Sequence, residues 1–284
     1  MNPLLPLIAA ILQAGSFTLD KFVLSMRSVS YKTYNGISMP LSVLIILVLF
    51  LIIQPPLLPV IFTNDIAWLI AISIIISAVT NILFYRALDD DSLSEMQTIE
   101  LLQSFPILFL SGVVFSEERD SFVLIPALAA SVALFWSHWE SKKFNLAPNT
   151  WPFFIWSLTA IPAGALIAKT LLVVWNPISL ELVRWSAVAL VTTVLFYKEA
   201  LAIRGRAFYF LVLTNILSTI GMVLFYYSYQ RSGIIYTLLL FSLQPFLVYL
   251  AAFLLFKEKI HWKKSVAFLV VLASIIIAQM AGHS

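Results

Sequence analysis

Long apolar runs separated by short polar connections constrain this chain more than any other feature. Because an α-helix rises 1.5 Å per residue, about 20 mostly apolar residues are enough to cross the hydrocarbon core of a bilayer. Ten stretches of the 284-residue chain qualify as spanning helices. They lie near residues 4–24, 36–53, 66–86, 93–115, 121–138, 152–174, 178–197, 207–229, 233–256 and 264–281. The sequence therefore predicts an all-α integral membrane protein with about ten transmembrane helices.

The composition agrees with lipid as the main solvent. Hydrophobic residues make up 61% of the chain and charged residues only 11%, against about 25% in a typical soluble protein. A β-barrel would need strands of alternating polarity, and Ile66 to Ile82 shows no alternation. The chain has no cysteine and its three histidines are far apart, so we expect no metal site and no cofactor. The basic residues are scattered between apolar runs, which argues against a nucleic-acid partner.

The two halves of the sequence resemble each other. At a constant offset of 141 residues, Leu83-Phe84-Tyr85 matches Leu224-Phe225-Tyr226, and Leu102-Gln103 matches Leu243-Gln244. Five spans in each half would make the second half enter the membrane in the opposite direction, which produces the inverted repeat common in secondary transporters. We therefore expect two inverted five-helix repeats. Their predicted bounds are residues 1–140 and 151–284, joined by a connecting loop at residues 141–150.

The segments that repeat also resemble a known family. Phe84-Tyr85-Arg86-Ala87-Leu88, the stretch from Gln103 to Glu117 and the stretch from Gln244 to Glu258 resemble the EamA family of the drug/metabolite transporter superfamily. This resemblance implies two inverted halves around a central cavity, with a solute carried by alternating access. It also implies that both termini lie in the cytoplasm.

The charge distribution favours the opposite orientation. The connections after odd-numbered predicted spans hold twelve basic residues, and those on the other side hold only Arg119 and Arg231. Positive charge is retained on the cytoplasmic side of a membrane, so this count places both termini outside the cytoplasm. The sequence alone leaves the orientation open between the two interpretations.

Glu100 is the sharpest candidate for function, because polar groups at membrane depth are costly and usually face a cavity or a partner. Gln97 and Gln103 lie one turn to either side on nearly the same face of the predicted helix. A protonatable carboxylate at this depth can couple solute movement to protons. The alternative is a carboxylate neutralised by Lys21 or another buried cation.

Two proline-containing segments occupy corresponding positions in the halves. Pro106 and Pro245 are expected to kink the fourth and ninth spans, because proline removes a backbone hydrogen bond. Gln103 and Gln244 lie close to these prolines, so we expect the two glutamines to line a central site symmetrically.

Further polar residues complete the candidate cavity lining: Asn81, Asn215, Lys169, Tyr85 and Tyr226. Lys169 can hold an anionic group of the solute, or it can extend its ammonium toward the nearer membrane interface. Tyrosines near span ends also serve as interface anchors.

Other charged residues have structural interpretations. Asp20 and Lys21 are adjacent, so they point about 100° apart on a helix and cannot both face one cavity. Glu181 and Arg184 are three residues apart and can pair with each other. Glu117 and Glu258 are more typical of helix caps or interfacial ion pairs than of solute contacts.

These features predict a secondary transporter that is not driven by ATP. It would export a small metabolite, such as an amino acid or a similar amphiphile, across a bacterial inner membrane, with protons as a second partner. A monomer is compatible with the sequence, which leaves the oligomeric state open. The alternatives are a membrane-embedded enzyme and a channel. We expect no enzyme, because the sequence has no phosphate loop, no clustered histidines and no convincing catalytic triad. A channel would favour oligomeric symmetry and a filter motif over an internal inverted repeat.

Overall fold

The computed structural model of the protein describes residues 3–27, 29–56, 64–138, 146–200, 203, 205–256 and 262–281. Every regular element in these ranges is a helix, as the apolar runs predict. The first half holds α1 (Leu4–Leu24), α2 (Tyr31–Ile53), α3 (Asn64–Asp90), α4 (Leu93–Val114), the short 3₁₀ helix η2 (Ser116–Glu118) and α5 (Ser121–His138). The second half holds α6 (Trp151–Leu172), α7 (Pro177–Ala200), α8 (Arg206–Ser232), α9 (Ile234–Phe241), α10 (Leu243–Phe256) and α11 (Trp262–Ala281).

The helices have the length and polarity of membrane spans. Seven helices among the described residues are long and apolar enough to cross a bilayer, and three shorter apolar helices accompany them. Large apolar side chains are exposed on the outside, among them Trp68, Val173 and Leu254. Water would not tolerate so much apolar surface, whereas lipid would. The prediction of an all-helical membrane protein is confirmed, and the total of ten spans stays a prediction.

The ninth predicted span is divided into two helices. α9 ends at Phe241 and α10 begins at Leu243, so the break falls at Ser242. Pro245 lies four residues after Phe241 and has no N–H to donate to its carbonyl, which accounts for the break at this position. α4 continues through Pro106 in the first half, so a kink there stays a prediction.

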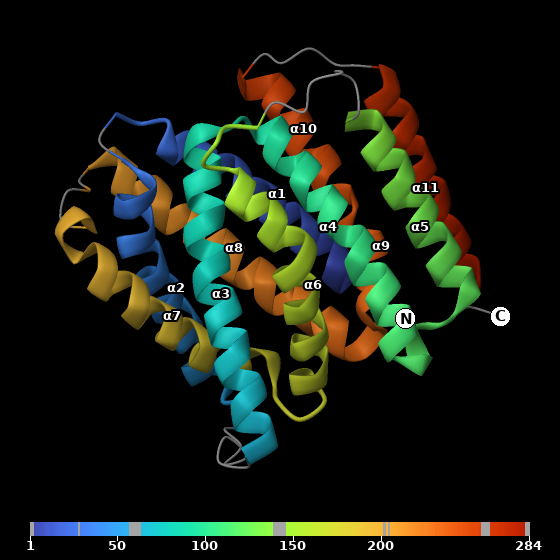
Figure 1. Ribbon diagram of the computed structural model, residues 1–284, viewed down its shortest axis with the longest axis horizontal. Helices are drawn as coiled ribbons and strands as arrows, with labels where there is room; N and C mark the ends of the chain where they lie inside the picture. The colour runs from blue at the N-terminus through green and yellow to red at the C-terminus, as the bar shows by residue number, and fades with distance from the viewer. Residues whose placement is uncertain are drawn as a thin grey trace.

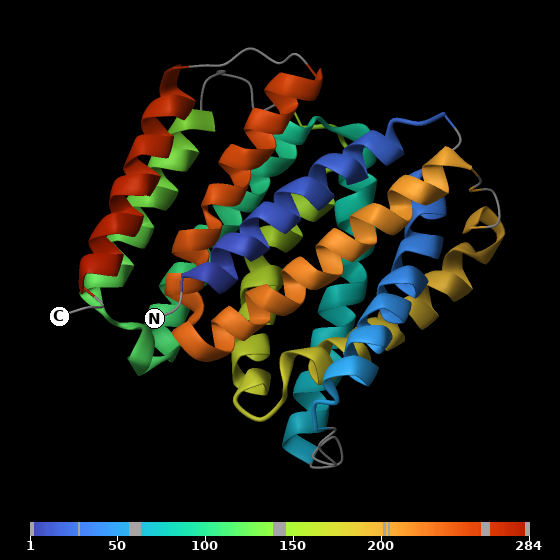
Figure 2. The ribbon, with the colours of Figure 1, turned by 180° about the vertical axis from the view of Figure 1, so that it is seen from behind.

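The helices pack in pairs that join the two halves (Figures 1 and 2). α1 lies along α8, α2 along α7, and α5 along α11, while α6 contacts both α3 and α4. Figure 2 shows α1 and α8 side by side across one face, and Figure 1 shows α3, α4 and α6 on the opposite face. Gly36 allows the close approach of α2 to α7, since a Cβ there would meet the carbonyl oxygen of Phe196 at 3.0 Å.

Candidate functional site

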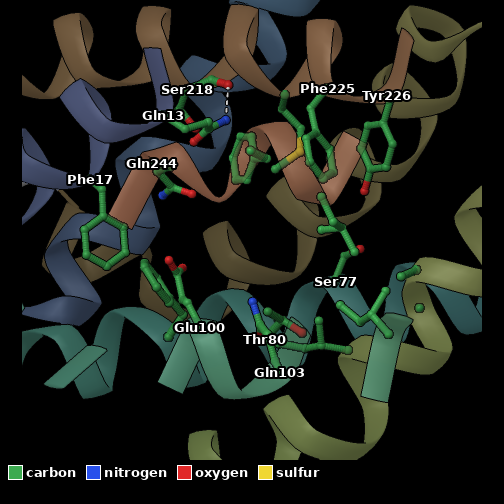
Figure 3. A pocket seen from close by; sticks show the side chains of 18 of the residues that line it. Gln13, Phe17, Ser77, Thr80, Glu100, Gln103, Ser218, Phe225, Tyr226 and Gln244 are labelled. Carbon is green, nitrogen blue, oxygen red and sulfur yellow. Dashed lines mark hydrogen bonds between the residues drawn. The ribbon is translucent and has the colours of Figure 1, made fainter. Parts of the chain in front are cut away.

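A cavity of about 380 Å³ lies at the centre of this arrangement (Figure 3). Its volume falls in the range of about 300–1,000 Å³ typical of small-molecule sites. Residues from α1 to α10 line it, so both halves of the chain contribute to the wall. Seven of the eight predicted cavity residues are among them: Asn81, Tyr85, Glu100, Gln103, Asn215, Tyr226 and Gln244. Pro245 also lines the cavity.

Glu100 extends into the cavity from the middle of α4. This helix begins with a capping box, in which Ser92 and Glu95 satisfy each other's backbone N–H groups, so its start is well defined. The side chain amide of Gln97 donates a hydrogen bond to Glu100 Oε2 at 3.2 Å. Within the described ranges, no lysine, arginine or histidine forms an ion pair with Glu100. The carboxylate therefore faces the cavity with only an amide as its partner.

Lys21 is not the counter-ion that the sequence allowed for Glu100. Its ammonium donates hydrogen bonds to the backbone carbonyls of Leu88 at 2.7 Å and Asp91 at 2.8 Å. A lysine at this position satisfies carbonyls that the end of α3 leaves without intrahelical partners. Lys21 thus fixes the connection between α3 and α4, and its charge is used outside the cavity.

Asp20 lies in the cavity wall within a group of hydroxyl donors. Thr214 Oγ1 donates to Asp20 Oδ1 at 2.5 Å, and Tyr34 donates to the same oxygen. Tyr85 reaches Oδ2 at 3.5 Å. These partners come from α8, α2 and α3, and only 3% of Asp20 is exposed. We call Asp20, Tyr34, Tyr85 and Thr214 the aspartate cluster.

Arg184 forms a second buried group in the cavity wall. Its Nη1 donates to Glu181 Oε1 at 2.7 Å and to the Tyr226 hydroxyl at 3.3 Å, and its Nη2 donates to Ser77 Oγ at 2.6 Å. Its guanidinium also lies 5.6 Å from the centre of the Tyr226 ring, which is cation–π range. We call Ser77, Glu181, Arg184 and Tyr226 the arginine cluster. The pairing of Glu181 with Arg184 was predicted, whereas their place in the cavity wall was not.

Lys169 is not among the residues that line the cavity. Its ammonium lies 3.4 Å from Glu118 Oε1 and 3.3 Å from the carbonyl oxygen of Tyr229. Glu118 also accepts hydrogen bonds from the backbone N–H groups of Ile234 at 2.6 Å and Ile235 at 3.0 Å, at the start of α9. A carboxylate stabilises a helix N-terminus, so this ion pair has a structural role where two connections meet.

Glu118 was missed by the sequence interpretation, which considered its neighbour Glu117 instead. Glu117 is exposed, and Glu258, its predicted counterpart, lies outside the described residues. Gly233 is the residue that permits the contact, because its φ is +87° and a Cβ there would meet Glu118 Oε1 at 2.6 Å. A glycine between two apolar runs was the only sequence signal for this contact.

The uncharged polar residues of the wall differ in how far their partners satisfy them. Asn215 Oδ1 accepts hydrogen bonds from Ser38 at 2.8 Å and Ser42 at 2.6 Å, and its Nδ2 donates to a backbone carbonyl. Asn81 Oδ1 and Gln103 Oε1, in contrast, are buried and accept no hydrogen bond. Buried polar atoms normally have partners, so these two oxygens are available to a ligand. Asn215 instead joins α2 to α8.

The remaining chemistry of the wall is limited. Within the described ranges, no three histidine, aspartate or glutamate side chains gather as metal ligands would. Gln13 donates a hydrogen bond to the carbonyl oxygen of Ser218 at 2.9 Å and so joins α1 to α8 (Figure 3). The described part of the site thus consists of a carboxylate without a cation partner, two amide oxygens without hydrogen bonds, aromatic rings and the two buried charged clusters.

Comparisons with known proteins agree with this architecture. A sequence model of the EamA-like transporter family matches residues 151–280. No curated protein matches the chain. Among solved structures, one described as "Crystal structure of protein" has a TM-score of 0.76 over 98% of this chain and 96% of its own, at 12% sequence identity. At that identity the likeness shows a shared fold.

Proposed function

We propose that the chain, whose residues 151–280 match the EamA-like transporter family, belongs to this family of the drug/metabolite transporter superfamily and carries a small solute by alternating access without using ATP. The observation that carries the proposal is the central cavity of about 380 Å³. Helices of both halves form its wall, so a rocking of one half against the other would open it to either side of the membrane.

The packing supports two inverted repeats as the basis of this movement. If residues 1–140 and 151–284 are equivalent, the contact of α1 with α8 corresponds to that of α6 with α3. Both contacts are present. A two-fold axis relating the halves would exchange α2 with α7 and α5 with α11. Each of these pairs is therefore its own counterpart, and both pairs are in contact. Tyr85 and Tyr226, which match at the 141-residue offset, both line the cavity. Of the predicted connecting loop at residues 141–150, the structure describes only residues 146–150.

The wall suits a small amphiphile such as an amino acid. Aromatic rings provide an apolar surface, and Glu100, Gln103 and Gln244 provide polar contacts on the same cavity. Glu100 has no cation partner among the described residues, which makes it the residue to couple transport to protons. We propose export across a bacterial inner membrane by a monomer. Known members of the family are transporters, which favours this function over a membrane-embedded enzyme or a channel.

Solute flux in proteoliposomes tests the proposal. Purified protein is reconstituted and supplied with labelled amino acids and other small metabolites, with and without a pH gradient. We expect saturable flux, and we expect Glu100→Gln to lose the part of the flux that the pH gradient drives. Glu117→Gln makes the same chemical change at an exposed position outside the cavity and serves as the control. Folded protein that moves no solute would contradict the proposal, and gradient-driven flux in Glu100→Gln would remove Glu100 from the coupling mechanism.

A further inference from the structure

The charges of the cavity wall do not balance. Three carboxylates line the cavity, those of Asp20, Glu100 and Glu181, and the only basic side chain among the described lining residues is Arg184. Opposite charges attract more strongly away from water, because the surroundings have a low dielectric constant. The imbalance remains even if Asp20 carries a proton, since Glu181 and Arg184 neutralise each other. The cavity therefore favours a positively charged occupant.

Arg184 offers little to the carboxylate of a solute. Its Nη1 is shared by Glu181 and Tyr226, and its Nη2 donates to Ser77. Nε has no acceptor among the described residues, so the guanidinium can still donate to a solute, but its charge is already paired with that of Glu181. A solute carboxylate approaching the guanidinium would also be repelled by Glu181, which lies 2.7 Å from it. Within the described wall, an anionic group thus has no free cation to bind.

Glu100 is the carboxylate that remains open to a ligand. Hydroxyl groups from three helices enclose Asp20, and Arg184 holds Glu181. Among the described residues, the Glu100 carboxylate has one hydrogen-bond partner, Gln97, and Gln103 follows one turn later on the same side of α4. Figure 3 shows Glu100 on the side of the cavity with Phe17 and Gln244, away from Ser77 and Tyr226 of the arginine cluster.

The polar groups of the cavity wall match a primary ammonium group. Such a group has three N–H donors and no acceptor. The wall provides the Glu100 carboxylate and two buried amide oxygens without partners, Asn81 Oδ1 and Gln103 Oε1. Rings of Phe17 and Phe225 line the same cavity, and aromatic faces attract cations as well as apolar groups.

We propose that the solute is an organic amine with a net positive charge and an apolar or aromatic body, and that its ammonium group binds Glu100. This inference rests on the proposed transport function and, within its class of small amphiphiles, favours the amine over the amino acid. An amine and the amino acid from which it derives share the same body and ammonium group, and they differ only in the carboxylate. Such pairs separate the two substrate classes directly.

The experiment compares tryptamine with tryptophan and tyramine with tyrosine in counterflow, using proteoliposomes loaded with the unlabelled compound. Counterflow reports carrier activity without depending on the direction of net transport, and protein-free liposomes correct for passive entry of the amines. We expect saturable exchange that is faster for each amine than for its amino acid by about tenfold, because the carboxylate of the amino acid would enter the cavity without a free cation to bind. Glu100→Gln should reduce amine exchange by about tenfold, and Glu117→Gln should leave it unchanged.

A binding measurement keeps the inference testable if Glu100→Gln does not fold. Tryptamine should raise the thermal unfolding temperature of the wild-type protein in detergent, and tryptophan at the same concentration should raise it less. Faster exchange and stronger stabilisation by the amino acids would overturn the amine inference and leave the carrier function standing. If none of these compounds is exchanged or stabilises the protein while other solutes move, the amine inference fails alone; if no solute moves, the transport function fails with it.

Discussion

The aspartate cluster and the arginine cluster each stabilise a buried charged side chain, but they do so with different partners. Each holds a charged side chain in the wall of the cavity, with 3% of Asp20 and 8% of Arg184 exposed. Asp20 is satisfied by neutral hydroxyl groups, whereas Arg184 is satisfied mainly by an opposite charge. Hydroxyl groups can either donate or accept, so the aspartate cluster can adapt to a change of charge. An ion pair cannot adapt to such a change, because neutralising one partner leaves the other as an uncompensated buried charge.

Thr214 illustrates this adaptability. It has one hydroxyl proton and two acceptors within reach, Asp20 Oδ1 at 2.5 Å and the carbonyl oxygen of Ser16 at 3.0 Å. When Asp20 is charged, Thr214 donates to it. When Asp20 carries a proton, Asp20 donates to Thr214, and Thr214 donates to Ser16. Both states keep the buried groups hydrogen-bonded, so we expect substitutions in the aspartate cluster to cost less free energy than those in the arginine cluster.

The largest effect is expected from Arg184→Met. It leaves Glu181 buried without its cation, and removing one partner of a buried ion pair costs about 3–5 kcal/mol. Denaturant titration in mixed micelles should show the free energy of unfolding lowered by this amount. A loss below about 1 kcal/mol would mean that water or another cation reaches Glu181, and the arginine cluster would then resemble the aspartate cluster.

Replacing both partners should cost less than replacing one. In the double variant Glu181→Met with Arg184→Met, no uncompensated charge remains, so we expect the free energy of unfolding to recover by about 2 kcal/mol or more relative to Arg184→Met alone. The four proteins of this double-mutant cycle are measured under the same conditions. Strictly additive losses would show that the two side chains do not depend on each other.

Thr214→Val should have an intermediate effect. Valine has nearly the shape of threonine, and it removes one hydrogen bond from the charged form of Asp20. A hydrogen bond to a charged group contributes about 1.5–3 kcal/mol, and Tyr34 still donates to the same oxygen, so we expect a loss of about 1–2 kcal/mol. The same titration measures it. A loss as large as that of Arg184→Met would remove the distinction between the clusters.

The smallest effect is expected from Asp20→Asn. The amide oxygen can accept from Tyr34 and Thr214 as the carboxylate does, and no opposite charge is left without a partner. We expect a change in the free energy of unfolding of about 1 kcal/mol or less. Asp20→Leu, which leaves the hydroxyl groups without an acceptor, provides the contrast and should cost more.

The sequence predicted the elements better than the contacts between them. Apolar runs marked the spans because lipid requires them, and Pro245 marked the segment where the ninth predicted span divides into α9 and α10. Glu100 and Gln103 were identified because buried polar residues are rare and their spacing on one helix is known. The ion pair of Lys169 with Glu118 was not predicted, because it depends on which connections meet in space. Hydrophobic periodicity carries no information of that kind.

Chemical labelling of the cavity from each side of the membrane tests alternating access. The chain has no cysteine, so a single one at Ser104, which lines the cavity, can be labelled specifically. Vesicles of both orientations are treated with a membrane-impermeant maleimide, with and without a transported solute. Alternating access predicts that Ser104→Cys is labelled from either side of the membrane and that saturating solute slows the labelling. Labelling from neither side, or from one side alone under every condition, would contradict alternating access of the cavity.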